Sequence, residues 1–313
     1  MAQKPLDYNA TITDWNLLTD QLVVFRLKQD TPFDGFTPGQ YTVLGINYEA
    51  GSVSRAYSIG SAPETIAEGL EFYIRRVPEP KGDVALTHLL FNLKAGERLW
   101  CAAKPRGHFT IEKAVGAEDP RHKVFIAAGT GLAPFTSMVK SHYLRHGAVD
   151  ERHIIAHGAS YATDLGYREE LERIMNSGGR TRYVPTLSRP DASWTGERGR
   201  VETHFEGERL AAFERKLGFQ PGHLRPENAV VFLCGLQGTI ANCLMQLLDR
   251  GFVPEDRKIR RALHIPDATH ASFFFEQYDS EPIIDLKDEA LAESLRARLR
   301  AAGVKLEAPE PVA

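Results

Sequence analysis

The stretch KVFIAAGTGLAP, residues 123–134, joins an apolar run to a glycine-rich loop. The run is typical of a buried strand, and FTSMVKSHYLRH, residues 135–146, follows with the pattern of a helix that has Pro134 in its first turn. Glycines at such a junction let backbone N–H groups approach an anion, and the helix N-terminus adds a favourable partial charge. No Gly-Lys-Ser/Thr follows, so the loop is not a P-loop. It is either a phosphate-binding loop or a tight strand–helix turn.

Three further apolar runs outside this stretch alternate with helical segments. The runs are His153–Gly158, Thr181–Ser188 and Val230–Gly235. The first three runs of the series begin about 30 residues apart, which is the size of one βα unit. We therefore predict a parallel sheet with helices on both faces, and such sheets bind ligands beyond the carboxyl ends of their strands.

A second glycine-containing loop, Cys234-Gly235-Leu236-Gln237-Gly238, follows the last of these runs, and a helix is expected over Thr239–Arg250. Two loops at strand ends of one sheet can face each other across a crevice. Cys234 would then lie at its mouth. The alternative is that Cys234 is a buried small hydrophobe, the commoner fate of a lone cysteine.

The first third of the chain has a different pattern. Short runs rich in β-branched and aromatic residues are separated by turn signals, and Leu86–Leu93 reads as a short helix. The runs are Leu22–Leu27, Tyr41–Ile46, Arg55–Gly60 and Leu70–Val77. Many short strands with few helices predict an antiparallel barrel. The polar stretch Gly116–His122 is the expected linker to the second domain.

The strand at Arg55-Ala56-Tyr57-Ser58 carries three side chains suited to a cofactor. Alternation should place Arg55 and Tyr57 on one face and Ala56 and Ser58 on the other. Arginine can hold a pyrophosphate, tyrosine offers a ring for stacking, and serine can donate a hydrogen bond. The alternative is an edge strand with a surface arginine and a core tyrosine.

The C-terminal stretch Asp285–Gly303 predicts an amphipathic helix. Leu291, Leu295 and Leu299 recur at a spacing of four, and Gly303 is a typical helix stop. Such a helix serves for packing or for dimerisation.

Composition excludes several classes of protein. The 313 residues are 42% hydrophobic and 25% charged, with a net charge of −3, so neither nucleic acid nor a membrane is an expected partner. The longest apolar run, Ala229–Leu236, is too short to span a membrane. No secretory signal is visible at the N-terminus, which favours a cytoplasmic protein. The 3 cysteines form no CxxC, so we expect no disulfide framework, iron–sulfur cluster or metal site.

Taken together and in order, the motifs resemble those of the ferredoxin–NADP(H) reductase family, most closely its bacterial type. The matching segments run from residue 38 to about residue 279: PGQY (38–41), RAYSIGSAP (55–63), LEFYIRRV (70–77), GTGLAPF (129–135), HG (157–158), YVPTLSRP (183–190), GRV (199–201) and CG (234–235). The resemblance implies an FAD-binding antiparallel β-barrel over 1–116, an NADP(H)-binding α/β domain over 117–280 and a C-terminal helical extension over 281–313.

For FAD, the resemblance implies that Arg55 holds the pyrophosphate, Tyr57 stacks on the isoalloxazine and Ser58 lies near flavin N5. Further implied FAD contacts are Ala56, Tyr73, Ile74, Arg75, Arg76, Val77 and Thr87.

For the nicotinamide coenzyme, Gly129, Thr130 and Gly131 match the loop under the pyrophosphate and ribose. Gly235 and Gln237 belong to the second loop. Ser58, Cys234 and Glu276 match the catalytic residues of the family. The arginines at 189, 198 and 200 match or adjoin positions that bind the 2′-phosphate, which favours NADPH over NADH. A solvated basic loop is the alternative, because Asp191 and Glu197 lie nearby.

The sequence departs from the family at two places. Ala159-Ser160 stands where bacterial relatives often carry an arginine, and the chain continues past residue 279, where relatives usually end. The aromatic that covers the flavin, among Phe274, Phe275 and Tyr278, is therefore left open. The extra helix is expected either to fold back on the FAD domain or to pair with a second subunit.

The implied activity is electron transfer between NADPH and a one-electron carrier, ferredoxin or flavodoxin, in a monomer or homodimer. The alternatives are an NAD(P)H-dependent reductase of an oxygenase or of flavin, and a non-catalytic flavin-binding sensor subunit. Candidate basic residues for docking an acidic carrier are Arg75, Arg76, Lys81, Lys104 and Arg106.

Overall fold

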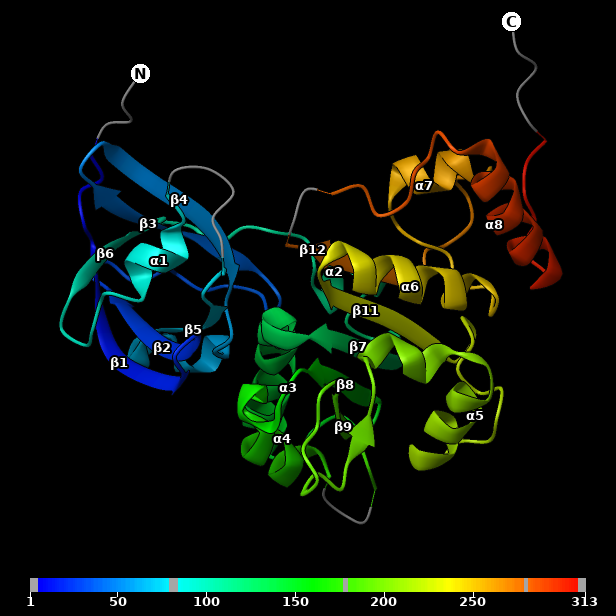
Figure 1. Cartoon of the computed structure of the whole chain (residues 1–313), viewed down its shortest axis with the longest axis horizontal. Coiled ribbons are helices and arrows are strands. Elements are labelled where there is room, and N and C mark those ends of the chain that lie inside the picture. The colour runs from blue at the N-terminus through cyan, green and yellow to red at the C-terminus, as the bar shows by residue number, and fades with distance from the viewer. Residues whose placement is uncertain (1–4, 79–83, 177–179, 279–280, 309–313) are drawn as a thin grey trace, which may run out of the picture. The chain divides into compact units, whose positions relative to one another are not determined.

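The computed structural model describes residues 5–78, 84–176, 180–278 and 281–308. The chain forms two compact units (Figure 1). The first comprises Met1–Ala117, Thr130–Asp150 and Tyr161–Arg168, and the second comprises Glu118–Gly129, Glu151–Ser160 and Glu169–Ala313.

The first unit contains the predicted antiparallel sheet, with six strands in the order β4-β3-β6-β1-β2-β5. The strands are β1 (Ala10–Thr19), β2 (Leu22–Gln29), β3 (Tyr41–Tyr48), β4 (Gly51–Ser58), β5 (Leu70–Arg75) and β6 (Arg98–Cys101). Its short helices are η1 (Pro63–Glu68), α1 (Leu86–Leu90), α2 (Ile111–Val115) and η3 (Ala162–Asp164). The four predicted strands and the short helix at Leu86 are confirmed.

The two outer strands of this sheet are joined just beyond β4. The Gly60 N–H donates to the Glu71 carbonyl of β5 at 2.8 Å, so the sheet curls towards closure. Its interior is filled by aromatic and branched side chains, among them the stacked pair Phe25 and Phe72 with ring centroids 5.4 Å apart. This closure gives the barrel that the sequence predicts.

The first unit also includes the helix that follows the glycine loop, α3 (Ala133–His146). Ser137 Oγ donates to the Ser61 carbonyl at 2.7 Å, and Ser141 Oγ donates to Glu64 at 3.0 Å. The Lys140 ammonium lies 3.6 Å from the Glu71 carboxylate. The helix is therefore attached to the loop and strand that follow β4.

The second unit contains a six-stranded parallel sheet in the order β10-β9-β8-β7-β11-β12. The strands are β7 (His122–Ala128), β8 (His153–Ala159), β9 (Tyr183–Leu187), β10 (Glu197–Arg198), β11 (Ala229–Gly235) and β12 (Phe273–Gln277). The four predicted strands are confirmed. From β7 the chain moves outward through β8 and β9 and then returns to place β11 on the other side, so the order reverses between β7 and β11.

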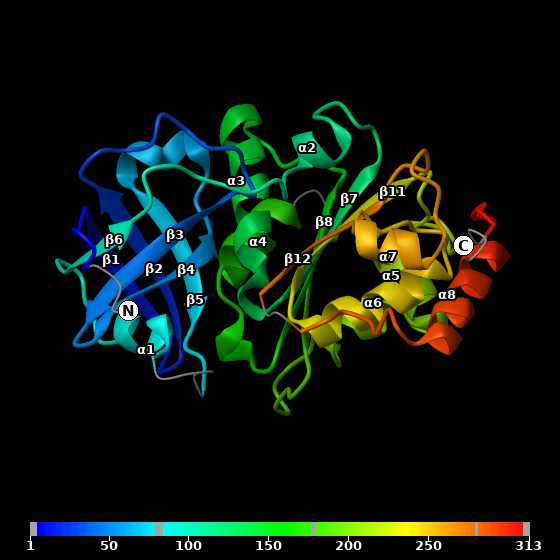
Figure 2. The same ribbon diagram turned by 90° about the horizontal axis from the view of Figure 1, so that it is seen from above.

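The helical elements of the second unit are α4 (Arg168–Met175), η5 (Val201–Phe205), α5 (Gly207–Lys216), α6 (Gln237–Leu248), α7 (Arg257–Ala262) and α8 (Glu289–Ala301). Of these, α5 to α8 gather on one side of the sheet, as Figure 2 shows. The short element η2 (Gly129–Leu132) begins in the second unit and continues into the first. Among the described helices, none is long and apolar enough to cross a membrane.

The C-terminal helix α8 packs inside the second unit. Leu295 and Leu299 are buried in the core that α6 and the sheet share, and Leu291 packs against its edge. Arg298 Nη1 donates to the Met245 carbonyl of α6 at 3.2 Å. The apolar stripe of α8 is therefore used for packing within the second unit, as the sequence predicts for a packing helix.

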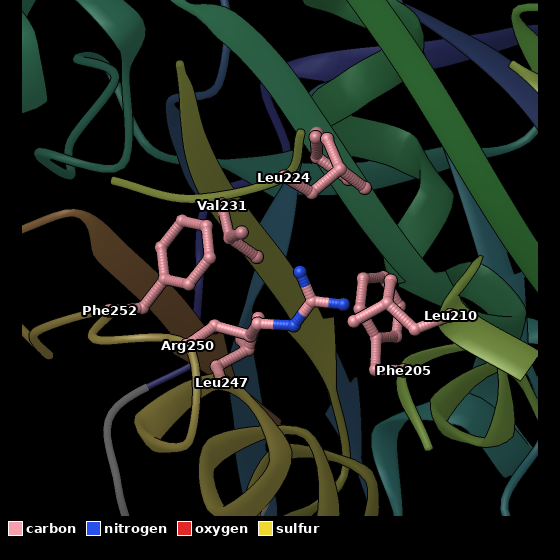
Figure 3. A pocket seen from close by; sticks show the side chains of 8 residues that line it. Phe205, Leu210, Leu224, Val231, Leu247, Arg250 and Phe252 are labelled. Atoms are coloured by element: carbon pink, nitrogen blue, oxygen red, sulfur yellow. The ribbon is translucent and has the colours of Figure 1, made fainter. Parts of the chain in front are cut away.

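A small apolar pocket lies in the core of the second unit (Figure 3). Val124 and Val231 belong to the amino-terminal halves of β7 and β11, so the pocket is away from the strand ends that carry the glycine loops. Arg250 lines it and lies 3.5 Å from the fully buried carboxylate of Glu214. Glu214 also accepts hydrogen bonds from the N–H groups of Gly222 and Leu224, so the pair is satisfied and serves packing.

Removing a core leucine from α8 should destabilise the protein. Leu299 is fully buried, so Leu299→Ala is expected to lower the free energy of unfolding by about 2–5 kcal/mol. Leu144→Ala is the control, because Leu144 is also helical but 49% exposed, and it should change stability by less than about 0.5 kcal/mol. Urea unfolding followed by circular dichroism measures both, and equal effects would show that α8 is not part of the core.

Candidate functional site

The glycine loop begins where β7 ends. Gly129 has φ 56°, a left-handed conformation that favours glycine, and η2 leads from it directly into α3. The break between the two compact units falls within this loop, between Gly129 and Thr130. The left-handed φ of Gly129 is the local reason that a glycine is favoured at this turn.

A buried histidine holds the carbonyl of Gly129. His157 Nε2 lies 3.1 Å from this oxygen, and Nδ1 lies 2.9 Å from the Tyr183 hydroxyl. Burial lowers the pKa of His157 to about 4, so the ring is neutral at physiological pH. A carbonyl only accepts, so Nε2 carries the proton and Nδ1 accepts from Tyr183. The sequence singled out His157-Gly158 only as a motif and missed this role.

The end of β8 approaches η5 closely. A Cβ on Gly158 would lie 2.8 Å from Cβ of Val201, so a larger residue would push the two elements apart. The close packing of Gly158 against Val201 fixes the position of the first residue of η5. It therefore also fixes the backbone position of Arg200, which directly precedes η5.

The second predicted loop lies beside the first. Within the parallel pair of β11 and β7, Cys234 is opposite Ala127, so both loops leave the same edge of the sheet at adjacent strands. This is the point at which the strand order reverses, where open α/β sheets bind their ligands. Within the second unit, the ends of β7 and β11, from which the two loops start, are therefore neighbours as expected.

Cys234 is fully buried rather than open at the mouth. Burial, with the nearby Glu276 carboxylate as a smaller cause, raises the pKa of its thiol well above the ordinary range, against a hydrogen bond with the Tyr278 side chain. The thiol is therefore neutral at physiological pH. It can pack and form a hydrogen bond, but it is neither a thiolate nucleophile nor a proton donor of useful strength.

Three residues at the end of β12 face this cysteine loop. Glu276 is opposite Cys234 in register and is partly exposed, and Gln277 is opposite Gly235. The Tyr278 N–H donates to the Gly235 carbonyl at 3.2 Å, and its side chain is 43% exposed. Phe274 is buried and Phe275 packs against the core, so Tyr278 is the aromatic of the three with a ring available to a cofactor.

The predicted arginines have different surroundings. Arg189 and Arg200 are exposed, and Arg200 lies 3.8 Å from the buried Glu202 carboxylate. Arg198 Nη2 donates to the Trp194 carbonyl at 2.7 Å, so its head group stabilises the local loop. Arg209, which the sequence reasoning did not single out, donates to the Arg198 carbonyl at 3.1 Å and brings a further cation to this surface.

In the first unit, the predicted flavin motif lies on the outermost strand, β4. Arg55 and Ala56 are exposed, and Arg55 Nη1 donates to the Ser54 carbonyl at 2.8 Å. Tyr57 packs half-buried against the core, and burial raises the pKa of its phenol. Ser58 is buried. An exposed cation, a half-buried ring and a buried hydroxyl thus follow one another, a donor set that fits a pyrophosphate and a flat ring.

The next segment predicted to contact FAD begins at Tyr73, and its first three side chains have partners or are buried within the first unit. The Tyr73 hydroxyl donates to the Asp164 carbonyl at 2.7 Å and accepts from the Gly166 N–H at 3.0 Å, while burial raises its pKa to about 12. Ile74 is buried, and Arg75 lies 3.1 Å from the Asp164 carboxylate. These three side chains are therefore already used within the first unit.

Beyond the end of β5, the chain is tied to α1. The Val77 N–H donates to Thr87 Oγ1 at 3.3 Å, and the Val77 carbonyl lies 2.7 Å from His88 Nε2. Arg76 is exposed. Lys81, which the sequence predicts as a docking residue, lies outside the residues that the structure describes. Among the described residues, no group of three or more His, Cys, Asp or Glu side chains that could hold a metal ion is found.

The comparisons with known proteins match both the barrel segment and the parallel-sheet segment of the chain. Residues 9–111 match an oxidoreductase FAD-binding domain, and residues 125–244 match an oxidoreductase NAD-binding domain. Ferredoxin–NADP reductase B of Sorangium cellulosum is 34% identical over 223 residues, which cover 71% of this chain and 82% of the relative. The chain belongs to the ferredoxin–NADP reductase family.

Two other proteins are also similar to this chain. A crystal structure of a ferredoxin NADP⁺ reductase from Neisseria gonorrhoeae with bound FAD and NADP has a TM-score of 0.69 and 20% identity, covering 87% of this chain and 99% of that one. The phenol hydroxylase P5 protein of Acinetobacter pittii is 29% identical, covering 83% of this chain and 67% of the relative. The protein is thus an FAD- and NAD(P)-dependent oxidoreductase.

The buried histidine of the reductase should make its stability depend on pH. The folded state lowers the pKa of His157 to about 4, so between pH 6.5 and 4 the unfolded chain binds more protons and stability falls as pH falls. His157→Gln keeps a donor and an acceptor but does not titrate. On going from pH 7 to pH 5, the variant is expected to lose about 2 kcal/mol less than the wild type. Urea unfolding at both pH values measures this, and equal losses would contradict it.

Proposed function

We propose that the protein is an NADPH-dependent ferredoxin–NADP⁺ reductase. The observation that carries the proposal is the placement of the Gly129 and Cys234 loops at adjacent strand ends where the sheet order reverses. The similarity to curated ferredoxin–NADP reductases supports the same activity. The donor set along β4 supports FAD as the bound group.

The residues proposed to hold FAD are those of β4 and the segment near α1. Arg55 pairs with the pyrophosphate, Tyr57 lies against the ring system and Ser58 donates a hydrogen bond to it. Backbone groups of residues 73–77 and the hydroxyl of Thr87 contact the remainder. Bound FAD supplies the link between a two-electron hydride donor and one-electron acceptors.

The residues proposed to hold NADPH belong to the other edge loops. Backbone N–H groups of Gly129–Gly131 and Gly235 approach the pyrophosphate and ribose. Arg189 and Arg200 pair with the 2′-phosphate, since an exposed guanidinium binds a phosphate in bidentate fashion. Arg198 holds the loop between them through Trp194.

Two side chains next to the nicotinamide have proposed roles of their own. Cys234 packs as a neutral thiol and excludes water from the end of β11. Glu276, opposite it in register and partly exposed, is placed to hold or release a proton at its carboxylate. Tyr278 presents its ring at the same edge.

The proposed electron partner is ferredoxin or flavodoxin. Such carriers are acidic proteins, and the exposed basic residues Arg76, Lys104 and Arg106 of the first unit suit them. The second candidate function is the NAD(P)H-dependent reductase component of an oxygenase, which the similarity to the phenol hydroxylase P5 protein favours.

An anaerobic titration tests the proposed activity directly. The purified protein should show a flavin spectrum that NADPH bleaches, and reduced protein should then reduce ferredoxin. Bleaching by NADH with little response to NADPH would favour the oxygenase component. A protein that binds FAD but is not bleached by either coenzyme would contradict both functions.

The preference for NADPH should depend on Arg200. Loss of a guanidinium–phosphate contact of about 1.5–3 kcal/mol predicts a rise of about 10- to 150-fold in KM for NADPH in Arg200→Gln, with KM for NADH unchanged. Arg180→Gln is the control, because Arg180 is an exposed arginine that pairs with Glu151 on the surface. Equal losses with both coenzymes would remove Arg200 from the 2′-phosphate site.

Ser58 and Cys234 should affect reduction of the flavin without affecting its retention. Ser58→Ala and Cys234→Ala are each expected to slow anaerobic bleaching by NADPH about tenfold, which corresponds to about 1.4 kcal/mol. FAD content should remain that of the wild type. Ser294→Ala, an exposed position of α8, is the control. Wild-type rates in both variants would exclude the two residues from the reaction.

A further inference from the structure

Gln237, at the first position of α6, contacts the C-terminal extension. Its Nε2 donates to the Ile283 carbonyl at 2.9 Å. A second glutamine holds the same short segment, since Gln277 Nε2 at the end of β12 donates to the Glu281 carbonyl at 2.6 Å. Residues 281–283 are thus linked to the ends of both β11 and β12 through two side-chain amides.

The rest of the C-terminal extension contacts the core of the second unit and the C-terminal end of α6. Ile283, Ile284 and Leu286 pack against the core of the second unit, and Leu295 and Leu299 of α8 lie within it. At the far end of α6, Arg298 Nη1 donates to the Met245 carbonyl and to the Asp249 carboxylate, both at 3.2 Å. The extension therefore contacts the first turn of α6 and also its last turns.

The first turn of α6 carries the loop proposed to contact the nicotinamide coenzyme. Gly235 ends β11, Leu236 is the residue before the helix, and Gln237 begins it. Hydride transfer requires reacting atoms to be within about 3–3.5 Å, so a displacement of about 1 Å in such a loop is costly. A hydrogen bond that fixes the loop therefore has a catalytic consequence even without touching the coenzyme.

We propose that residues 281–301 hold the Cys234–Gln237 loop in place, and we call this segment the positioning clamp. The side-chain amide of Gln237 ties the loop to the clamp through its hydrogen bond to Ile283, and it is not a ligand of the coenzyme. Gln237 is accordingly a positioning residue. The catalytic consequence rests on the proposed function, whereas the clamp itself is a property of the second unit and can be measured without coenzyme.

The clamp is tested first by amide hydrogen exchange on the FAD-loaded protein without NADPH. Gln237→Met and Gln277→Met remove one amide donor each at nearly constant volume. Since one hydrogen bond is worth about 1 kcal/mol, each variant should speed exchange at residues 238–241 about fivefold. Gln220→Met is the matched control, because Gln220 is exposed in the loop after α5, and it should change nothing. Wild-type exchange in both variants would overturn the clamp.

A double-mutant cycle then separates positioning from direct contact. Both glutamines act through one segment, so each single variant should slow anaerobic flavin reduction by NADPH about fivefold, and the double variant should be no more than about tenfold slower. A slow Gln237→Met with a wild-type Gln277→Met, or fully additive effects, would overturn the proposal in favour of direct contact. If the wild type itself were not reduced by NADPH, the proposed function would fail, and the exchange result would still decide the clamp.

Discussion

The pairing of β7 with β11 is the constraint on which the nucleotide-binding half depends. The two strands lie far apart in the sequence, yet Cys234 is opposite Ala127, and this register places two glycine loops at one edge of the sheet. The alternation of apolar runs with helices requires a parallel sheet, and the return of the chain to the other side of β7 creates the reversal of strand order. A shift of one residue would move Cys234 and Glu276 to the wrong face.

Burial determines the chemistry around this edge. His157 is neutral because the sheet interior does not solvate its cation, and neutrality in turn fixes which nitrogen holds Gly129. The same effect keeps Cys234 protonated, so its contribution is packing and a hydrogen bond with Tyr278. Glu276, opposite Cys234 in register, is only partly buried, so its surroundings differ from those of the two buried groups. Exposure thus distinguishes the residues at this edge from one another, and the proposed division between packing and proton transfer rests on this difference.

Much of the fold could be predicted from the sequence, because β7, β8 and β11 are continuous apolar runs between turn signals. β1 was missed because an irregularity between Ile12 and Asp14 breaks its alternation, and β6 because it has only four residues. At the candidate site, the glycine loops were predicted from motifs and Glu276 from the resemblance to the family. The hydrogen bonds of Arg198, His157 and Gln237 could not be predicted, because each is made to a backbone carbonyl and no sequence pattern indicates such a partner. The choice of Tyr278 also required the burial of Phe274.

The incorporation of α8 into the core restricts how the length of this chain can change. Leu295 and Leu299 cover apolar surface of the nucleotide-binding half that would otherwise face water. A variant truncated near residue 280 would expose the apolar side of α6 and would need polar substitutions there to avoid aggregation. Conversely, a fusion partner attached after residue 308 would sit beyond the last packed leucine and leave that surface covered. The length of the chain and the apolar side of α6 are therefore coupled, so that a change in one requires a change in the other.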